Sequence, residues 1–418
     1  MSNISLPREA ALKALVSCEK DGAYLNIALR DILASSGMEP RDNALATTIA
    51  FGVMKNTLFL DNIIENLSTV KLKKLSVWIH NILRIGIYCI KFLDRIPVSA
   101  TVNECVRLSR RYGHKASAGF VNAVLRKSSQ CGDFLPEDKN NPRYISIRYS
   151  LPMWLAEMWQ KQGYGEEFFQ AMLEEPPVTV RLNTLKCKSL PPEFEKIQLL
   201  PYGYNYIGKG SIEKNDLFKD GSITVQDGAS QFAVGALDVH ENMDVLDLCS
   251  APGGKSAYMA QLMNNTGKII SCDIHEHKIE LIKKNLQRQG VTNTEVILND
   301  ATVLRDDFIG RFDRVLADVP CSGLGVIRRK PDIKMTKSDL VNSELTKIQK
   351  KILENAAQYV KPGGKLLYST CTVNKNENED IIGEFLKKHS GFVLTEQKQL
   401  LPHTDNTDGF FYAALERK

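Results

Sequence analysis

The sequence predicts a multidomain protein with an all-α bundle at the N-terminus, a small α+β module in the middle and a C-terminal α/β domain. Up to about residue 130, apolar residues recur three and four positions apart, as they do on one face of a helix. From about residue 240, short β-branched runs alternate with helical stretches, which is typical of a doubly wound, mostly parallel sheet. A chain of 418 residues with 43% hydrophobic positions can form two or three separate cores.

The helical bundle is predicted over residues 1–130. Its helical stretches, separated by short polar breaks, are EAALKALVSC, ALATTIAFGVMKNTLFLDNIIENL, WIHNILRIGIYCIKFL and TVNECVRLSRRYG. Residues 131–144 then lose this periodicity and gain proline, asparagine and acidic residues, so we expect a linker there.

The charge of the chain is concentrated in the same region. Residues 1–140 contain 19 Lys and Arg against 13 Asp and Glu, whereas the formal charge of the whole chain is only +5. A basic domain favours an anionic partner, of which nucleic acid is the commonest, although a solvated basic surface is the alternative. We therefore expect the N-terminal bundle to bind RNA or DNA.

The composition also indicates where in the cell the protein is located. The nine cysteines form no CxxC pair and no cluster with histidine, which indicates neither a disulfide framework nor a metal site. No apolar stretch approaches the roughly 20 residues that cross a membrane, and the N-terminus lacks the apolar core of a signal peptide. We expect a cytoplasmic protein without a membrane partner.

Two further domains are predicted after the linker. Residues 145–235 combine helical stretches with the short strands VTVRLN and SITVQD, as in a small α+β module. Residues 236–418 form the α/β domain, with predicted strands MDVLDL, KIISCD, TEVILND, FDRVLAD and GKLLYST. Polar residues follow each strand, and in such sheets ligands bind beyond the carboxyl ends of the strands.

The first of these strands leads into the glycine-rich turn DLCSAPGGKS at residues 247–256. A Walker A phosphate loop would need glycine at position 249, where this chain has Cys249. Asp273, which ends the next strand, is placed to accept hydrogen bonds from ribose hydroxyls, or alternatively to cap the following helix. The third strand ends in Asn299 and Asp300, within reach of an adenine. S-adenosylmethionine fits this set better than a nucleotide because it brings no polyphosphate.

Two cysteines directly follow the last two predicted strands. Cys321 comes after Asp318, Val319 and Pro320, and Cys371 comes after the Ser-Thr pair that ends the next strand. Carbon 5 of a pyrimidine is too weak a nucleophile to accept a methyl group unless a thiolate first adds to carbon 6. The pair therefore favours pyrimidine methylation, and the alternative is two cysteines that only fill the core.

These motifs carry a family resemblance. The turn CSAPGGK, the loop DVPCSG and the loop STCT occur in the same order in RNA 5-methylcytosine methyltransferases of the Sun/NOL1/NOP2 family, which the C-terminal half resembles. The helical region, through TVNECVRLSRRYG and FVNAVLRK, resembles NusB-like RNA-binding domains. A NusB-like domain joined to this catalytic domain is similar to the bacterial methyltransferases of 16S ribosomal RNA.

The resemblance implies a role for each matching residue. Cys371 would be the nucleophile, Cys321 would assist product release, Asp318 would hold the polar edge of the cytosine, and Lys255 would steady charge nearby. The implied S-adenosylmethionine site consists of Cys249, Ser250, Ala251, Pro252, Gly253, Gly254, Lys255, Asp273, Asp300 and Asp318. Candidate RNA contacts are Arg110 and Arg111 in the bundle and Arg328, Arg329 and Lys330 after the first cysteine loop, which could instead be a solvated loop. The implied partner is 16S ribosomal RNA, naked or in a partly assembled small subunit, and we expect a monomer.

Three other functions compete with RNA methylation. Cys249 argues against a P-loop nucleotide hydrolase, because it stands where the phosphate loop needs glycine. The chain retains both cysteines and all three strand-end aspartates, which argues against a non-enzymatic RNA-binding protein. A methyltransferase of small molecules would leave the basic N-terminal domain without a purpose. Cytosine-5 methylation of 16S ribosomal RNA is the function that the sequence predicts.

Overall fold

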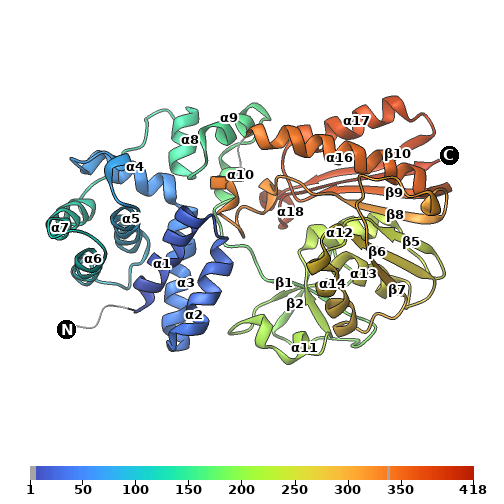
Figure 1. Cartoon of the computed structure of the whole chain (residues 1–418), viewed down its shortest axis with the longest axis horizontal. Helices are drawn as coiled ribbons and strands as arrows, with labels where there is room; N and C mark the ends of the chain where they lie inside the picture. Colours follow the sequence, from blue (N-terminus) through green and yellow to red (C-terminus); the bar gives the residue numbers. More distant parts are fainter. Residues whose placement is uncertain (1–5, 337–338) are drawn as a thin grey trace. The chain divides into compact units, whose positions relative to one another are not determined.

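The computed structural model describes residues 6–336 and 339–418 (Figure 1). The chain divides into two compact units. The first unit extends to Glu174 and also takes in a short later segment, Ile327–Thr336. The second unit contains Glu175–Val326 and the chain that follows the short segment, to Lys418.

The described residues of the first unit form helices and no strand. Its elements are α1 (Leu6–Asp21), α2 (Leu25–Ser36), α3 (Pro40–Lys55), α4 (Thr57–Leu67), the 3-10 turn η1 (Leu72–Lys74), α5 (Val77–Phe92), α6 (Val98–Tyr112), α7 (Ser117–Ser128), α8 (Pro142–Arg148), α9 (Met153–Lys161), α10 (Glu166–Ala171) and α15 (Ile333–Thr336). The predicted helical bundle is confirmed.

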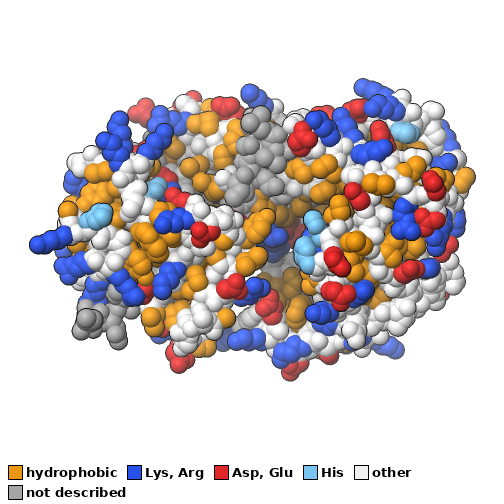
Figure 2. All heavy atoms as spheres, viewed as in Figure 1, with side chains coloured by type: hydrophobic (Ala, Val, Ile, Leu, Met, Phe, Trp, Pro, Cys, Tyr) orange, Lys and Arg blue, Asp and Glu red, His pale blue; other side chains and the backbone are white. Residues whose placement is uncertain are grey.

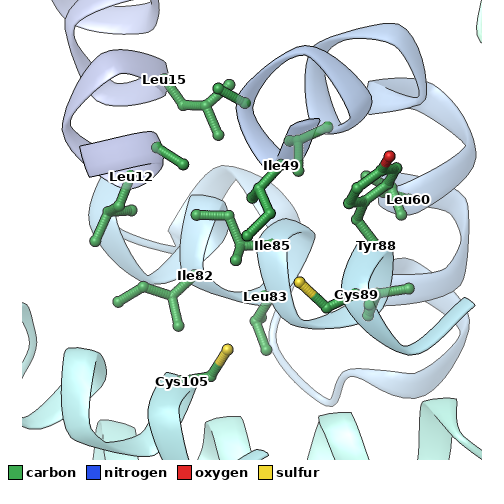
Figure 3. Close-up of a cluster of buried hydrophobic side chains, with 14 of the residues drawn as sticks. Leu12, Leu15, Ile49, Leu60, Ile82, Leu83, Ile85, Tyr88, Cys89 and Cys105 are labelled. Carbon is green, nitrogen blue, oxygen red and sulfur yellow. The ribbon is translucent and has the colours of Figure 1, made fainter. Parts of the chain in front are cut away.

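An apolar core joins helices α1 to α7 of the first unit (Figure 3). Helix α5 is central to it. Ser76 caps this helix by accepting a hydrogen bond from the backbone N–H of Ile79, and apolar side chains follow on most of its faces. Ile49 of α3 packs against them, as do Cys89 of α5 itself and Cys105 of α6, both fully buried. These two cysteines serve as small core residues.

The segment Ile327–Thr336 packs within the first unit although it lies far along the chain. Lys334 is almost fully buried and donates a hydrogen bond of 2.7 Å to the carbonyl oxygen of Lys55, at the end of α3. A cavity of about 370 Å³ lies between this segment and helices α1, α3 and α5. Its wall includes Leu15, Val53, Asp332 and Met335. The first unit is therefore built from two separate stretches of sequence.

The second unit contains two sheets. The smaller, antiparallel one has the strand order β2-β3-β1-β4, from β1 (Thr179–Leu182), β2 (Phe194–Lys196), β3 (Gly203–Tyr206) and β4 (Ile223–Val225), with η2 (Ile212–Lys214) and α11 (Asp216–Lys219) before its last strand. The larger sheet has the order β10-β11-β9-β8-β5-β6-β7. Its strands are β5 (Asp244–Asp247), β6 (Lys268–Asp273), β7 (Thr294–Leu298), β8 (Phe312–Asp318), β9 (Val360–Thr370), β10 (Phe392–Leu400) and β11 (Phe410–Arg417).

Helices cover both faces of the larger sheet (Figure 1). They are α12 (Gly228–Leu237), α13 (Gly254–Leu262), α14 (Glu276–Arg288), α16 (Asp339–Tyr359) and α17 (Glu379–Lys388), with α18 (Pro402–Asp405) and the turns η3 (Asp306–Phe308), η4 (Leu324–Val326) and η5 (Lys375–Glu377) in the loops. Because side chains alternate along a strand, Val245 of β5 enters the core beneath α12 and α13, whereas Leu246 enters the core beneath α16. Strands β5 to β9 run parallel, which confirms the predicted doubly wound α/β domain.

The structure differs from the sequence prediction in two places. The stretch 145–235, predicted as one module, divides: the helices before Glu175 pack in the first unit, whereas the strands of the small sheet, α11 and the start of α12 lie in the second. Strands β10 and β11 were not predicted, and β11 pairs antiparallel with both β9 and β10. Within the described ranges, no helix is both long and apolar enough to cross a membrane.

Candidate active site

A cavity of about 260 Å³ opens at the carboxyl ends of the parallel strands in the second unit. Its wall is contributed by the residues that follow β5, β6, β7 and β8, together with two isoleucines of α16. The wall is formed by Leu248, Cys249, Ala251, Asp273, Ile274, His275, Lys278, Asn299, Asp300, Ala301, Thr302, Asp318, Val319, Pro320, Ile348 and Ile352. Five residues of the predicted cofactor site thus line one cavity: Cys249, Ala251, Asp273, Asp300 and Asp318.

The glycine-rich turn forms one wall of this cavity and is held close to the sheet. The backbone N–H of Ser250 donates to the carbonyl oxygen of Cys272 on β6 at 2.8 Å. Gly253 directly precedes α13 with a φ of 98°, a conformation that favours glycine, and a Cβ atom there would lie 3.3 Å from Ile282. Asn285 of α14 donates to the carbonyl oxygen of Pro252 at 2.8 Å. Pro252 and the glycines therefore shape the turn, although they do not line the cavity.

A buried carboxyl group lies beneath the turn. Asp247, at the end of β5, is fully buried and accepts a hydrogen bond of 2.6 Å from Ser256, which in turn accepts one from Ser271. Burial raises the pKa of Asp247 to about 7, because the charged form loses its hydration. Burial also raises the pKa of Cys249 well above its usual range, so this cysteine stays a neutral thiol.

The strand-end acceptors lie around the cavity with hydrogen-bonding capacity to spare. Asp273 is 6% exposed, and its Oδ1 accepts from the backbone N–H of His275 at 3.0 Å. Asp300 Oδ1 accepts from the backbone and side chain of Thr302. The side-chain nitrogen of Asn299 is buried and has no hydrogen-bond partner among the described residues. A buried donor of this kind indicates a missing ligand or water, because buried polar groups are almost always paired.

Lys255 and Asp318 form an ion pair beside the cavity. Lys255 Nζ lies 2.6 Å from Asp318 Oδ2, while Ser369 at the end of β9 donates to Asp318 Oδ1 at 2.8 Å. Burial disfavours the ammonium ion, but Asp318 outweighs this cost and raises the pKa of Lys255 above its usual value. Lys255 also lies 5.3 Å from the ring centroid of Phe410. The turn after β5 is thereby joined to the ends of β8 and β9.

The two predicted cysteines meet at the ends of adjacent strands. β8 and β9 are parallel neighbours in which Asp318 pairs with Ser369, so the loops that follow them start side by side. Cys321 Sγ lies 3.2 Å from Cys371 Sγ, within hydrogen-bonding distance for sulfur. All nine cysteines, this pair included, are free thiols. Two cysteines that are 50 residues apart in the sequence thus form one dithiol site.

The sequence analysis missed the residues that support this pair. Glu377 of η5 is fully buried, and the side chains of Ser322, Gln349 and Asn374 all donate hydrogen bonds to it. Glu377 lies only six residues after Cys371, and this proximity was the single signal in the sequence. Its partners come from three separate stretches of chain, which no local pattern brings together.

Comparison with known proteins places the chain in a family. Residues 234–416 match the 16S rRNA methyltransferases RsmB/F, and residues 5–130 match the NusB family. The chain is 35% identical to a probable ribosomal RNA small subunit methyltransferase B of Bacillus subtilis, over 98% of each chain. The chain belongs to the RsmB/F family. It is also 30% identical to a protein of the same description from Synechocystis, over 98% of this chain and 99% of that one. The crystal structure of PH0851 matches all of both chains with a TM-score of 0.83 and 27% identity.

S-adenosylmethionine is the cofactor of this RsmB/F methyltransferase, and the cavity fits it. The cofactor has hydroxyl and amino groups that need acceptors, and Asp273 and Asp300 supply carboxylates at the ends of β6 and β7. Its adenine and carboxylate need donors, of which the buried nitrogen of Asn299 is one without a protein partner. The turn offers backbone groups in place of a phosphate loop.

The candidate RNA contacts of this RsmB/F chain all lie in the first unit. Arg110 and Arg111 end α6 and are exposed, and Arg111 pairs with Glu9 at 3.1 Å. Figure 2 shows Lys and Arg side chains over the helices of this unit, with fewer acidic ones. The candidate contacts at residues 328–330 differ in exposure. Lys330 is exposed and Arg329 is half-buried, but Arg328 is only 5% exposed. Lys330 is thus better placed for an RNA phosphate than Arg328.

Proposed function

We propose that this chain methylates carbon 5 of a cytidine in 16S ribosomal RNA through a covalent bond between Cys371 and the base. The observation that carries the proposal is the 3.2 Å separation of Cys321 Sγ and Cys371 Sγ, beside an ion pair and a cofactor-sized cavity. One thiol would form the bond to the base and the other would help to break it. A methyltransferase acting on nitrogen or oxygen has no need of either.

Each step of the reaction has a residue to perform it. The Cys371 thiolate adds to carbon 6 of the cytosine, and the displaced electron pair makes carbon 5 nucleophilic. Bound S-adenosylmethionine supplies the methyl group, which carbon 5 takes. Asp318, held by Lys255 and Ser369, accepts hydrogen bonds from the amino edge of the base and fixes its orientation.

Carbon 5 then carries both the new methyl group and its original proton. Cys321 removes that proton, the double bond between carbons 5 and 6 re-forms, and the bond from carbon 6 to sulfur breaks. Cys371 leaves as a thiolate, ready for another cycle. Before it acts as this base, Cys321 must lose its own proton to water, and this loss becomes easier once Cys371 is bonded to carbon and no longer carries the charge that kept Cys321 protonated.

The environments of the two thiols support this division of roles. The hydrogen bond to Cys371 and then burial raise the pKa of Cys321 well above its usual range. The proton shared by the pair therefore stays on Cys321, and the charge falls on Cys371, where it interacts electrostatically with the ammonium of Lys255. A thiolate is the nucleophilic form of cysteine, so Cys371 is the better nucleophile.

The N-terminal bundle supplies RNA affinity. Its basic excess and its match to the NusB family support binding to ribosomal RNA, whether naked or in a partly assembled small subunit. One chain contains the cavity and both cysteines, so we propose that it acts as a monomer, in the cytoplasm where ribosomal RNA is modified. The curated relatives named as small subunit methyltransferases support 16S ribosomal RNA as the substrate.

Single substitutions of the two cysteines test the mechanism. Cys371→Ala should abolish methylation and leave cofactor binding intact, because no sulfur adds to carbon 6. Cys321→Ala should transfer one methyl group and then stall, leaving protein bonded to RNA. On a denaturing gel this complex is a slow band that nuclease removes. Trapping in Cys371→Ala instead would exchange the two roles, and activity in both variants without trapping would contradict the mechanism.

A further inference from the structure

We propose that Glu377 is a positioning residue that holds the two cysteine loops in register and assigns the two thiols to different roles. It touches neither the base nor the cofactor cavity, and it acts through the groups that carry the cysteines. This role deepens the proposed function and rests on it.

Four hydrogen bonds converge on the Glu377 carboxylate. Oε1 accepts from the Ser322 hydroxyl at 2.5 Å and from the Asn374 side chain at 2.9 Å. Oε2 accepts from the backbone N–H of Ser322 and from the Gln349 side chain, each at 2.9 Å. Ser322 directly follows Cys321, and Asn374 lies three residues after Cys371. One carboxylate therefore anchors the loop of each cysteine.

Two further contacts make this anchor a closed network. The same Gln349 nitrogen donates to the carbonyl oxygen of Pro320 at 2.9 Å, so α16 fixes both ends of the turn that contains Cys321. The hydroxyls of Ser322 and Thr372 lie 2.7 Å apart and join the two loops directly. Thr372 directly follows Cys371, as Ser322 follows Cys321, so this contact links the two residues that come after the cysteines. This network of hydrogen bonds therefore fixes the separation of the two sulfur atoms.

The chemistry of the network requires a carboxylate. Glu377 is fully buried, and no Lys, Arg or His among the described residues forms an ion pair with it. All four partners are donors, and an ionised carboxylate offers only acceptors. A glutamine at this position would present an NH₂ group to two of these donors, leaving them without partners in a buried site. Burying a carboxylate is costly, and a group that only filled space would be apolar.

The charge of Glu377 also distinguishes the two thiols. Together with the hydrogen bond to Cys371 and burial, its negative charge raises the pKa of Cys321. Lys255 interacts electrostatically with Cys371, and after Asp318 the charge on Cys371 contributes to the raised pKa of this lysine. Tyr368 and Asp318 are the other titratable groups beside the site. The negative charge of Glu377 disfavours a thiolate on Cys321, and the positive charge of Lys255 favours one on Cys371.

Alkylation of the full-length protein tests this role without RNA. We would treat wild type and Glu377→Gln with limiting iodoacetamide at neutral pH and follow each cysteine by peptide mass spectrometry. Cys371 should react faster than Cys321 in wild type. In Glu377→Gln this preference should fall about tenfold, the change that one pKa unit produces in thiolate population. The methylation kcat should fall by at least as much, with the affinity for S-adenosylmethionine unchanged.

Control variants distinguish a loss of thiol positioning in Glu377→Gln from a general loss of folding. Glu379→Gln changes a neighbouring half-buried carboxyl group that has no hydrogen bond to either cysteine loop, and it should keep the wild-type preference. Glu377→Asp keeps the charge but is too short to reach all four donors, so it should preserve more of the preference than of kcat. Buried Cys272 should stay unmodified in each folded variant.

Three results would overturn the role of Glu377. The first is an unchanged cysteine preference in folded Glu377→Gln. If that variant labels Cys272 and is therefore unfolded, Asn374→Ala removes a single arm of the network, and an unchanged preference there is the second. The third is an equal loss of preference in Glu379→Gln. Methylation by Cys371→Ala would instead refute the proposed nucleophile, and the alkylation ratio would still measure Glu377.

Discussion

Asp273 offers the most direct quantitative test of the cofactor site. In Asp273→Ala the carboxylate at the end of β6 is lost, together with its bond to the backbone N–H of His275. Oδ1 also lies 3.7 Å from Lys278 Nζ, but this lysine is 38% exposed and the pair contributes little. Oδ2 accepts no hydrogen bond from the described part of the chain and is the atom that would bind a ribose hydroxyl.

The magnitude follows from that single bond. A hydrogen bond to a charged group contributes about 1.5–3 kcal/mol, so Asp273→Ala should weaken S-adenosylmethionine binding roughly 10- to 150-fold. Asp273→Asn keeps one acceptor oxygen for His275 and places its NH₂ group at the ribose, where it can only donate a neutral hydrogen bond, so this variant should lose about half of that free energy. The backbone N–H of His275 loses its acceptor in the alanine variant, which should lower the stability of the protein by about 1 kcal/mol.

Isothermal titration calorimetry on folded protein measures the effect, with thermal melting to confirm that each variant is folded. Asp307→Ala is the control, because Asp307 is an exposed carboxylate paired with Arg305 and lies outside the cavity wall. It should bind the cofactor as wild type does. Equal affinity in Asp273→Ala and Asp307→Ala would refute the ribose contact. The absence of heat with wild type would mean that the cavity does not bind S-adenosylmethionine.

Two more predictions concern RNA binding and stability. Arg110→Ala should weaken RNA binding and reduce the slope of log affinity against log salt by about 0.7, the value for one phosphate contact on a single strand. Arg30→Ala, an exposed arginine paired with Asp31, serves as the control, and an unchanged slope in Arg110→Ala would mean that α6 meets no phosphate. The raised pKa of Asp247, about 7 against 3.8, means that folding binds a proton, so the free energy of unfolding should fall as pH rises from about 4 to 7, by at most roughly 4 kcal/mol. Asp247→Asn should remove this fall in urea titrations, and an identical pH dependence in both proteins would contradict the assignment.

The sequence predicted what depends on local pattern. Helical periodicity identified the first bundle, and strand–helix alternation identified the parallel sheet, whose strand ends bring Asp273, Asp300 and Asp318 to one cavity. Strand β10 escaped prediction because its polar, mostly exposed residues do not alternate clearly, and β11 escaped because a short apolar run that is buried on both faces does not alternate at all. Glu377 escaped because a buried glutamate cannot be told from an exposed one without its partners. Arg328 was predicted at the surface because its burial depends on packing within a unit that is distant in the sequence.

The discontinuous first unit has a consequence for how the protein is made. Helices α1 to α10 leave the ribosome first, but Asp332 and Lys334, which complete the packing around α3, follow only after Val326. At about 5–20 residues per second, the intervening chain takes roughly ten to thirty seconds to synthesise. During that interval the apolar wall formed by Leu15 and Val53 lacks its final cover. Recombination that moved the N-terminal helices alone into another protein would leave them permanently in that state.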